Sequence, residues 1–302
     1  MTTRDRFLGC LLGLAVGDAV GTALEFKPRG SFTPITDMVG GGPFRLKPGQ
    51  WTDDTSMALC LASSLVEKGR FDAEDQMRRY VRWHEDGYWS STGRCFDIGN
   101  ATGAALARFK RTGDPFAGSS DPHSAGNGSI MRLAPVPMFY AGDLEKAIHY
   151  SAESSRTTHG AEECIDACRL FGAILVRALT GATKEDVLTA DAKSFSGAPK
   201  IVDIARGTYR SKDERAIKGS AYVVASLEAA LWCFDRTDSF DAAVLRAANL
   251  GDDADTTAAV CGQVAGAFYG VQGIRPGWLE KLAMRAEIED LASKLFELGG
   301  AE

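Results

Sequence analysis

Apolar residues recur every three to four positions along most of the chain, whereas the alternating β-branched runs typical of strands are nearly absent. That period is the mark of amphipathic helices. No linker, low-complexity tract or repeat divides the chain, so we expect one all-α domain over residues 1–302. The pattern predicts helices over residues 53–68, 73–84, 144–155, 162–179, 221–234, 240–248, 256–269 and 278–296.

The chain begins with another apolar segment, residues 7–17, which ends at Asp18 after eleven residues. Such a run is too short to span a bilayer, and no convincing signal-peptide cleavage site follows it. We therefore expect a buried helix and no membrane insertion. Its glycines recur every four residues on one face, which permits close approach of another helix or a ligand: Gly9, Gly13, Gly17 and Gly21.

The composition narrows the class of protein. Of the 302 residues, 45% are hydrophobic and 25% are charged, as in an ordinary globular protein. The formal charge of −6 and the absence of a basic tract argue against direct nucleic-acid binding. Seven scattered cysteines without a C-x-x-C pair indicate reduced thiols and a cytoplasmic protein. We expect it to be a monomer.

Two aspartate-rich segments open predicted helices. Residues 52–55 read Thr-Asp-Asp-Thr, and residues 251–257 read Gly-Asp-Asp-Ala-Asp-Thr-Thr. Each alone is explained by helix capping, for which Asp and Thr are preferred. Together they crowd negative charge, which is unfavourable unless cations neutralise it. Carboxylate and hydroxyl oxygens without His or Cys suit Mg²⁺ or Mn²⁺, so the two helix starts predict a pair of divalent ions if they converge.

Two long irregular stretches, residues 26–51 and about 86–127, interrupt the helical pattern. Loops this long in a helical domain usually serve a site. The second stretch contains Phe-Asp-Ile-Gly-Asn at residues 96–100 and leads into Gly-Asn-Gly-Ser at residues 126–129. The latter is a tight-loop signal whose exposed N–H groups could receive a diphosphate, although a purely structural turn has the same composition.

Several blocks, in this order and spacing, resemble the ADP-ribosylglycohydrolase family, and especially its bacterial dinitrogenase-reductase-activating glycohydrolase branch. The resemblance covers nearly the whole chain. One departure is Asp252, which stands where the family usually has a second glycine before its Asp-x-Asp-Thr block. The blocks that carry the resemblance are residues 13–19, 24–26, 47–50, 52–55, 97–100, 125–128, 131–132 and 253–256.

The resemblance implies an orthogonal helical bundle around two Mg²⁺ or Mn²⁺ ions. By position, the metal ligands would be Thr52, Asp53, Asp54, Asp253, Asp255 and Thr256. Asp54 or Glu25 would take a proton from water as the catalytic base. The substrate-binding residues would be Asp97, Asn100, Gly126, Asn127, Gly128, Ser129 and His159. For His159 alone, a structural role is an equal alternative.

The activity that the resemblance implies is removal of ADP-ribose from a protein side chain, most directly from arginine. The partner would be an ADP-ribosylated protein or another ADP-ribose conjugate. One alternative is hydrolysis of another linkage, such as an O-linked serine. A two-metal phosphoesterase would use similar aspartate clusters. A non-catalytic ADP-ribose-binding protein is a third alternative, which the crowded acids disfavour.

Overall fold

The computed structural model describes residues 1–189 and 194–300, and over these ranges the chain is helical, with isolated bridges but no β-strand. The expectation of an all-α fold is confirmed. The α-helices are α1 Thr3–Gly21, α2 Asp53–Lys68, α3 Ala73–Asp86, α4 Asn100–Thr112, α5 Pro135–Phe139, α6 Leu144–Arg156, α7 Glu162–Leu179, α8 Lys184–Leu188, α9 Pro199–Ala205, α10 Val223–Asp235, α11 Phe240–Ala248, α12 Ala254–Tyr269, α13 Pro276–Lys281 and α14 Arg285–Leu298. Short 3₁₀ helices are η1 Thr22–Leu24, η2 Pro122–Ser124, η3 Thr208–Ser211, η4 Glu214–Ala216 and η5 Val271–Gly273.

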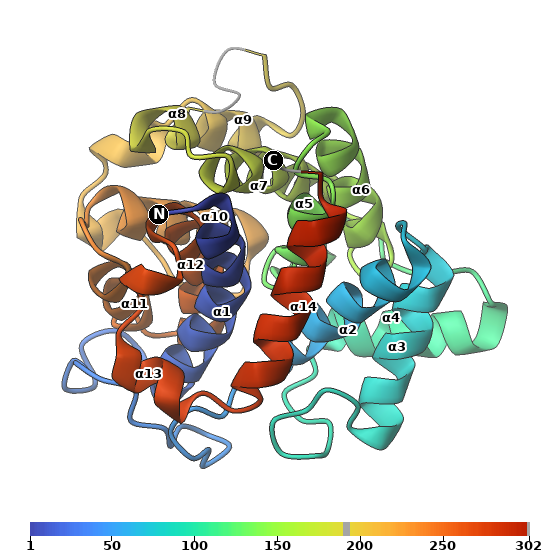
Figure 1. The fold of residues 1–302 in the computed structure, drawn as a ribbon, viewed down its shortest axis with the longest axis horizontal. Coiled ribbons are helices and arrows are strands. Elements are labelled where there is room, and N and C mark those ends of the chain that lie inside the picture. Colours follow the sequence, from blue (N-terminus) through green and yellow to red (C-terminus); the bar gives the residue numbers. More distant parts are fainter. Residues whose placement is uncertain (190–193, 301–302) are drawn as a thin grey trace.

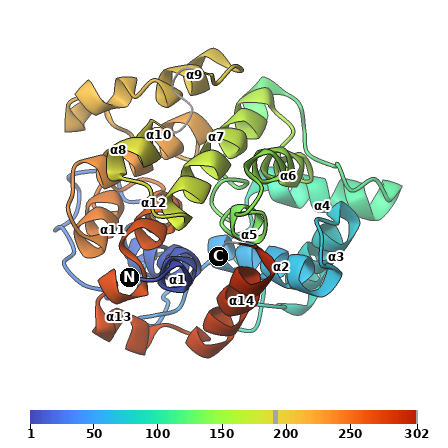
Figure 2. The ribbon, with the colours of Figure 1, turned by 45° about the horizontal axis from the view of Figure 1, so that its top comes forward.

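Helices α1 and α12 lie side by side at the centre of the bundle, and the other helices surround them (Figures 1 and 2). The glycines of α1 face the backbone of α12. A Cβ atom added at Gly13 would lie 2.3 Å from the carbonyl oxygen of Gly262, and one at Gly17 would lie 2.2 Å from that of Ala258. In the same way, Gly262 and Gly266 of α12 lie directly against the backbone of α1, where an added Cβ atom would collide with it. The stripe therefore serves close helix packing, and the ligand alternative is not needed to explain it.

Replacing Gly13 with alanine should destabilise the protein, because its methyl group would collide with backbone that cannot move aside as a flexible side chain could. We expect a loss of about 1–3 kcal/mol in the free energy of unfolding, measured by denaturant titration. The matched control is Gly103→Ala in the interior of α4, where the nearest atom to an added Cβ lies 4.0 Å away. That control should be neutral or stabilising. Equal effects at both positions would contradict the packing account.

Helix α1 and η1 together are long and apolar enough to cross a membrane by length and composition. However, 94% of the most apolar window is buried inside the protein. Asp18 lies within this segment and is fully buried. The expected buried first helix is confirmed, and it extends past Asp18 instead of ending there.

One helix prediction and one prediction of irregular structure are wrong. Residues 278–296 form two helices, α13 and α14, because the chain turns at Leu282–Met284, where Met284 adopts a left-handed φ of 53°. In the turn, the Ala283 N–H donates to the Gly49 carbonyl of a distant loop at 2.9 Å. Residues 86–127 are not irregular throughout, since α4 buries Leu106 and Phe109.

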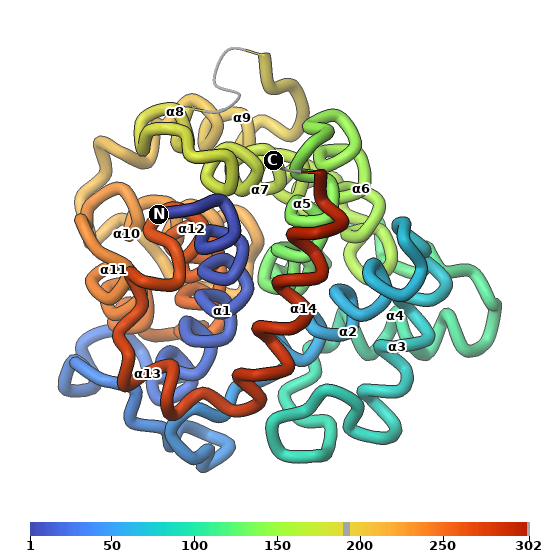
Figure 3. The backbone as a smooth tube through the Cα atoms, in the orientation of Figure 1, coloured from blue at the N-terminus to red at the C-terminus, as the bar shows by residue number. Residues whose placement is uncertain are grey.

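The two long loops, residues 25–52 and 87–99, both lie at the lower end of the molecule in the view of Figure 3. The first loop leads into α2, and the second leads into α4. The start of α12 is brought to the same place by backbone pairing, since Phe26 N–H donates to the Asp252 carbonyl at 2.7 Å. The fold thus gathers the first turns of α2, α4 and α12 around one pocket.

Candidate metal centre and substrate pocket

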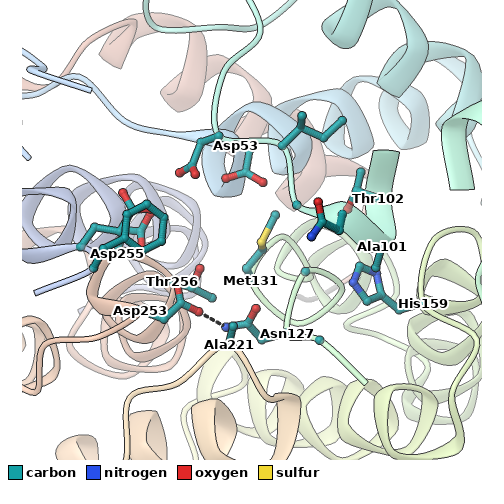
Figure 4. Close-up of a pocket in the computed structure, with 18 residues that line it drawn as sticks. Asp53, Ala101, Thr102, Asn127, Met131, His159, Ala221, Asp253, Asp255 and Thr256 are labelled. Atoms are coloured by element: carbon teal, nitrogen blue, oxygen red, sulfur yellow. Dashed lines mark hydrogen bonds between the residues drawn. The ribbon is translucent and has the colours of Figure 1, made fainter. Parts of the chain in front are cut away.

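The pocket between these helix starts has a volume of about 330 Å³. Its predicted members are Glu25, Asp53, Asp97, Asn100, Gly126, Asn127, Gly128, His159, Asp253, Asp255 and Thr256. Figure 4 shows Asp53, Asp253 and Asp255 on one side and His159 and Thr102 on the other, with Asn127 between them. The structure therefore brings together acids and loop residues that lie far apart in the sequence.

Thr52, Asp54 and Ser129 do not line the pocket, although sequence reasoning placed them in the site. Thr52 and Asp54 are fully buried directly behind the pocket acids. The Thr52 hydroxyl lies 3.2 Å from a carboxylate oxygen of Asp54 and 3.4 Å from one of Asp255. Ser129 is 2% exposed as a whole residue, so its place in the substrate site stays a prediction.

Carboxylate oxygens converge in two groups that share one residue. Asp18, Asp54 and Asp255 place one oxygen each within 4.8 Å of one another, and so do Glu25, Asp97 and Asp255. Asp255 lies in the first turn of α12, and Asp54 lies in that of α2. The two helix starts therefore converge, which is the condition on which the expected pair of divalent ions depends.

Asp18 is the site residue that sequence reasoning missed. Its carboxylate accepts hydrogen bonds from the backbone N–H of Thr52 at 2.9 Å and of Thr55 at 3.1 Å. It also accepts bonds from both threonine hydroxyls, at 2.9 Å and 2.6 Å. Asp18 therefore caps α2 from the neighbouring helix and fixes its first turn. The signal in the sequence is an acid inside an otherwise apolar helix, where an unpaired carboxylate would be costly.

Crowding and burial act on the same acids. Burial, with the charges of Asp97 and Asp253, raises the pKa of Glu25 to about 9. Burial, with the charges of Asp18 and Asp253, raises the pKa of Asp97 to about 7. Burial also raises the pKa of Asp18 to about 6, against the hydrogen bonds from Thr55 and Thr52.

The same burial raises the pKa of Asp53, Asp54 and Asp255 well above the ordinary value. The side chain of Asp253 accepts a hydrogen bond of 2.5 Å from the Asn127 amide, yet burial still raises the pKa of Asp253. Ionisation of all of these carboxylates together therefore requires a compensating positive charge.

The donor set fits divalent cations. Within residues 1–189 and 194–300, no Lys or Arg forms an ion pair with any of these acids. Over the same ranges, one buried carboxylate oxygen on each of Glu25, Asp54 and Asp255 has no hydrogen-bond partner. Free, buried carboxylate oxygens in a cluster are what Mg²⁺ and Mn²⁺ bind.

The loop at residues 126–129 has fewer free backbone N–H groups for an anion than its composition suggests. The Gly126 N–H already donates to the Ser124 carbonyl at 2.8 Å, and the Asn127 N–H donates to the Ala221 carbonyl at 3.0 Å. In the described part of the chain, the N–H groups of Gly128 and Ser129 have no backbone acceptor. The expected diphosphate contact therefore depends on the second half of the loop.

Phe26 lines the pocket, and Asp252 directly precedes the pocket residue Asp253. Phe26 and Asp252 both have left-handed backbone, with φ of 60° and 56°, and Asp252 N–H donates to the Lys27 carbonyl at 2.8 Å. Left-handed backbone favours glycine, and Asp is among the other residues that tolerate it. Phe26 is 66% exposed at the pocket. Sequence reasoning did not single out Phe26.

The protein is an all-α bundle in which the first turns of two helices place clustered carboxylates at one pocket. This fold and this acidic site together indicate its family. The chain belongs to the ADP-ribosylglycohydrolase family, whose model matches residues 1–302.

Its relatives include ADP-ribosylarginine hydrolase Tri1 of Pseudomonas putida (strain GB-1), 50% identical over 97% of this chain and 78% of the relative. The Tri1 of Serratia proteamaculans (strain 568) is 44% identical over 99% of this chain and 81% of the relative. The ADP-ribosyl-[dinitrogen reductase] glycohydrolase of Rhodospirillum rubrum is 34% identical over 95% and 94%. A solved ADP-ribosylglycohydrolase-related protein complex superposes with a TM-score of 0.88 at 43% identity, over 98% of this chain and 99% of that one.

Proposed function

We propose that the protein hydrolyses the N-glycosidic bond between ADP-ribose and an arginine side chain of a modified protein, releasing ADP-ribose. The observation that carries this proposal is that two clusters of three carboxylates, with Asp255 in common, meet at one pocket. Supporting it, the chain is 50% identical to a relative named as an ADP-ribosylarginine hydrolase.

Two divalent cations, Mg²⁺ or Mn²⁺, are the cofactors that the acids suit. Bound there, they would neutralise the carboxylates and act as Lewis acids toward water and the ribose hydroxyls. The residues that would hold them are Thr52, Asp53, Asp54, Asp253, Asp255 and Thr256, joined by Asp18 behind the first turn of α2.

Glu25 is better placed than Asp54 to take a proton from the attacking water. Glu25 lines the pocket, whereas Asp54 lies behind it. The Asp54 carboxylate instead lies 3.4 Å from the Thr256 hydroxyl, which can donate to it, and 3.2 Å from the Thr52 hydroxyl, whose proton goes to the nearer Asp18. In the reaction, water adds to the anomeric carbon and the bond to nitrogen breaks through an oxocarbenium-like transition state. We assign Asp54 to holding the cations and Glu25 to the base.

The far side of the pocket suits the substrate diphosphate. The first turn of α4, from Asn100 to Thr102, lines the pocket, and its N-cap, Gly99, offers no side-chain cap. Unpaired N–H groups and the positive end of the helix dipole favour an anion there. The N–H group of Gly128 and the ring of His159 complete this side.

Arginine-linked ADP-ribose should be hydrolysed faster than serine-linked ADP-ribose. The half-buried Asp97 carboxylate can accept charge-assisted hydrogen bonds from a guanidinium, which serine lacks. We expect kcat/KM to differ by at least about tenfold, the effect of one such interaction, and Asp97→Asn to reduce the difference. Equal rates on both linkages, or a preference that survives Asp97→Asn, would place specificity elsewhere.

The product distinguishes the proposal from its rivals. Incubation with an ADP-ribosylated arginine peptide and Mg²⁺ or Mn²⁺, followed by mass spectrometry, should yield intact ADP-ribose and unmodified arginine. AMP with a ribose phosphate left on the peptide would instead indicate a phosphoesterase. Binding of ADP-ribose without any turnover would indicate a non-catalytic reader.

We also propose that the protein acts in the cytoplasm as a monomer on ADP-ribosylated proteins. All seven cysteines are free, and six of them are buried, which suits a reducing compartment. The acidic net charge of −6 is consistent with a protein partner and not with nucleic acid.

A further inference from the structure

Behind the loop at residues 126–129 lies a buried cation with no carboxylate partner. Arg132 is 0% exposed, and within the described residues it forms no ion pair. Its guanidinium lies over the Tyr80 ring, 4.9 Å from the ring centre. Burying a charge without a counter-ion is unfavourable, so the contacts of this guanidinium should show what it does in the fold.

The two shortest hydrogen bonds of Arg132 lead to the pocket wall, while longer ones run to the Ser154 carbonyl at 3.3 Å and to the Thr157 hydroxyl at 3.5 Å. One Arg132 nitrogen donates to the Gly128 carbonyl at 2.7 Å, and the other donates to the Thr158 hydroxyl at 2.7 Å. The Thr158 hydroxyl in turn lies 2.8 Å from Nδ1 of His159. A single side chain thus holds the loop on one side and, through a hydroxyl, the histidine on the other.

This chain of bonds sets where His159 carries its proton. The Thr158 oxygen accepts from Arg132, and among the described residues its own proton has no acceptor other than Nδ1 of His159. Nδ1 is therefore the acceptor, which leaves the proton of the neutral ring on Nε2. Nε2 lies beside the loop, since a Cβ added at Gly128 would be 3.0 Å from it.

We propose that Arg132 and Thr158 are positioning residues for the substrate diphosphate. Arg132 holds Gly128 in place and, through the Thr158 hydroxyl, fixes His159 so that Nε2–H donates into the pocket. The inference rests on the proposed function, because it takes the diphosphate of ADP-ribose as the anion received there. The ring of His159 stands on the pocket side opposite the acids, as Figure 4 shows.

The test replaces single hydroxyls. Thr158→Val removes the link to His159 with little change in volume, and Thr158→Ser restores the hydroxyl. Thr157→Val is the matched control, because its equally buried hydroxyl lies 3.5 Å from Arg132 and makes no bond to His159. In the metal-free protein, ¹⁵N NMR of the four histidines reports the tautomer of His159 directly.

We expect a single Nε2–H tautomer in wild type, Thr158→Ser and Thr157→Val, and loss of that single state in Thr158→Val. With Mg²⁺ present, Thr158→Val should weaken ADP-ribose binding by about tenfold, the effect of one hydrogen bond to a charged group. KM should rise by a similar factor with little change in kcat. The Ser variant and the control should stay within about twofold of wild type, well inside the effect of one such bond.

Unchanged tautomer and affinity in Thr158→Val would overturn the proposal, and so would an equal loss in Thr157→Val. Wild-type protein that binds no ADP-ribose would instead refute the function on which the proposal rests. If Thr158→Val does not fold, Arg132→Met serves in its place. Methionine keeps an unbranched apolar stem but has no N–H donor for Gly128 or Thr158, so wild-type affinity in that variant would also contradict the proposal.

Discussion

Replacing Asp255 with asparagine should abolish turnover while leaving the metal-free protein as stable as wild type or more so. Asp255 belongs to both clusters of three carboxylates, so its replacement affects both clusters at once. Loss of residues that only support a metal ligand already costs 10–100-fold, so we expect more than about a hundredfold loss in kcat. Removing one charge from a crowded cluster should meanwhile relieve repulsion in the metal-free fold.

The matched control is Asp252→Asn, three residues before Asp255 in the loop that leads into α12. Asp252 is exposed and lies outside both carboxylate groups, and asparagine tolerates its left-handed backbone. An activity assay and a thermal melt on each protein separate chemistry from folding. A folded Asp255→Asn protein with wild-type turnover would remove Asp255 from the mechanism.

The metal-free protein should lose stability as the pH rises from about 4 to about 9. The pKa of Asp18, Asp97 and Glu25 is raised in the folded protein to about 6, 7 and 9, from ordinary values of 3.8, 3.8 and 4.5. A raised pKa means that the folded state binds the proton more tightly than the unfolded chain does. The contribution of these protonated acids to the free energy of unfolding is therefore fully present below their ordinary pKa. It is lost as the pH rises through their raised pKa.

Divalent cations should reverse this loss. At pH 8 to 9, saturating Mg²⁺ or Mn²⁺ should raise the melting temperature by about 5–10 °C, and at pH 5 by much less. ADP-ribose should raise it further only when the cation is present. A melting temperature that is constant from pH 5 to 9 and insensitive to either cation would show that the acids are not a cation site.

The sequence is informative about the site wherever local structure decides the geometry. The start of α2 at Asp53 and the acids of the first turn of α12 were predictable from residue preferences and helix period, although neither Thr52 nor Asp253 makes a side-chain cap hydrogen bond. Their convergence depended on how α1 and α12 pack. The glycine stripe of α1 indicated a close neighbour, but its partner glycines, Gly262 and Gly266, could not be identified without the fold.

Tertiary contacts explain what was missed. Asp18 became a site residue only because α1 delivers it to the N-terminus of α2, where it accepts the N–H groups of Thr52 and Thr55. The break before α14 reflects a hydrogen bond between Ala283 and Gly49, which no local pattern encodes. Likewise, the Asn127 N–H is taken by Ala221, 94 positions later in the chain, so the loop composition overstated its free donors.

The most direct test of the central claim is turnover of an ADP-ribosylated arginine peptide by protein stripped of metal with a chelator. The stripped protein should be inactive, and activity should return on titration with Mg²⁺ or Mn²⁺ and saturate near two ions per chain, with intact ADP-ribose as the product. Hydrolysis at the full rate in the presence of the chelator would contradict the account.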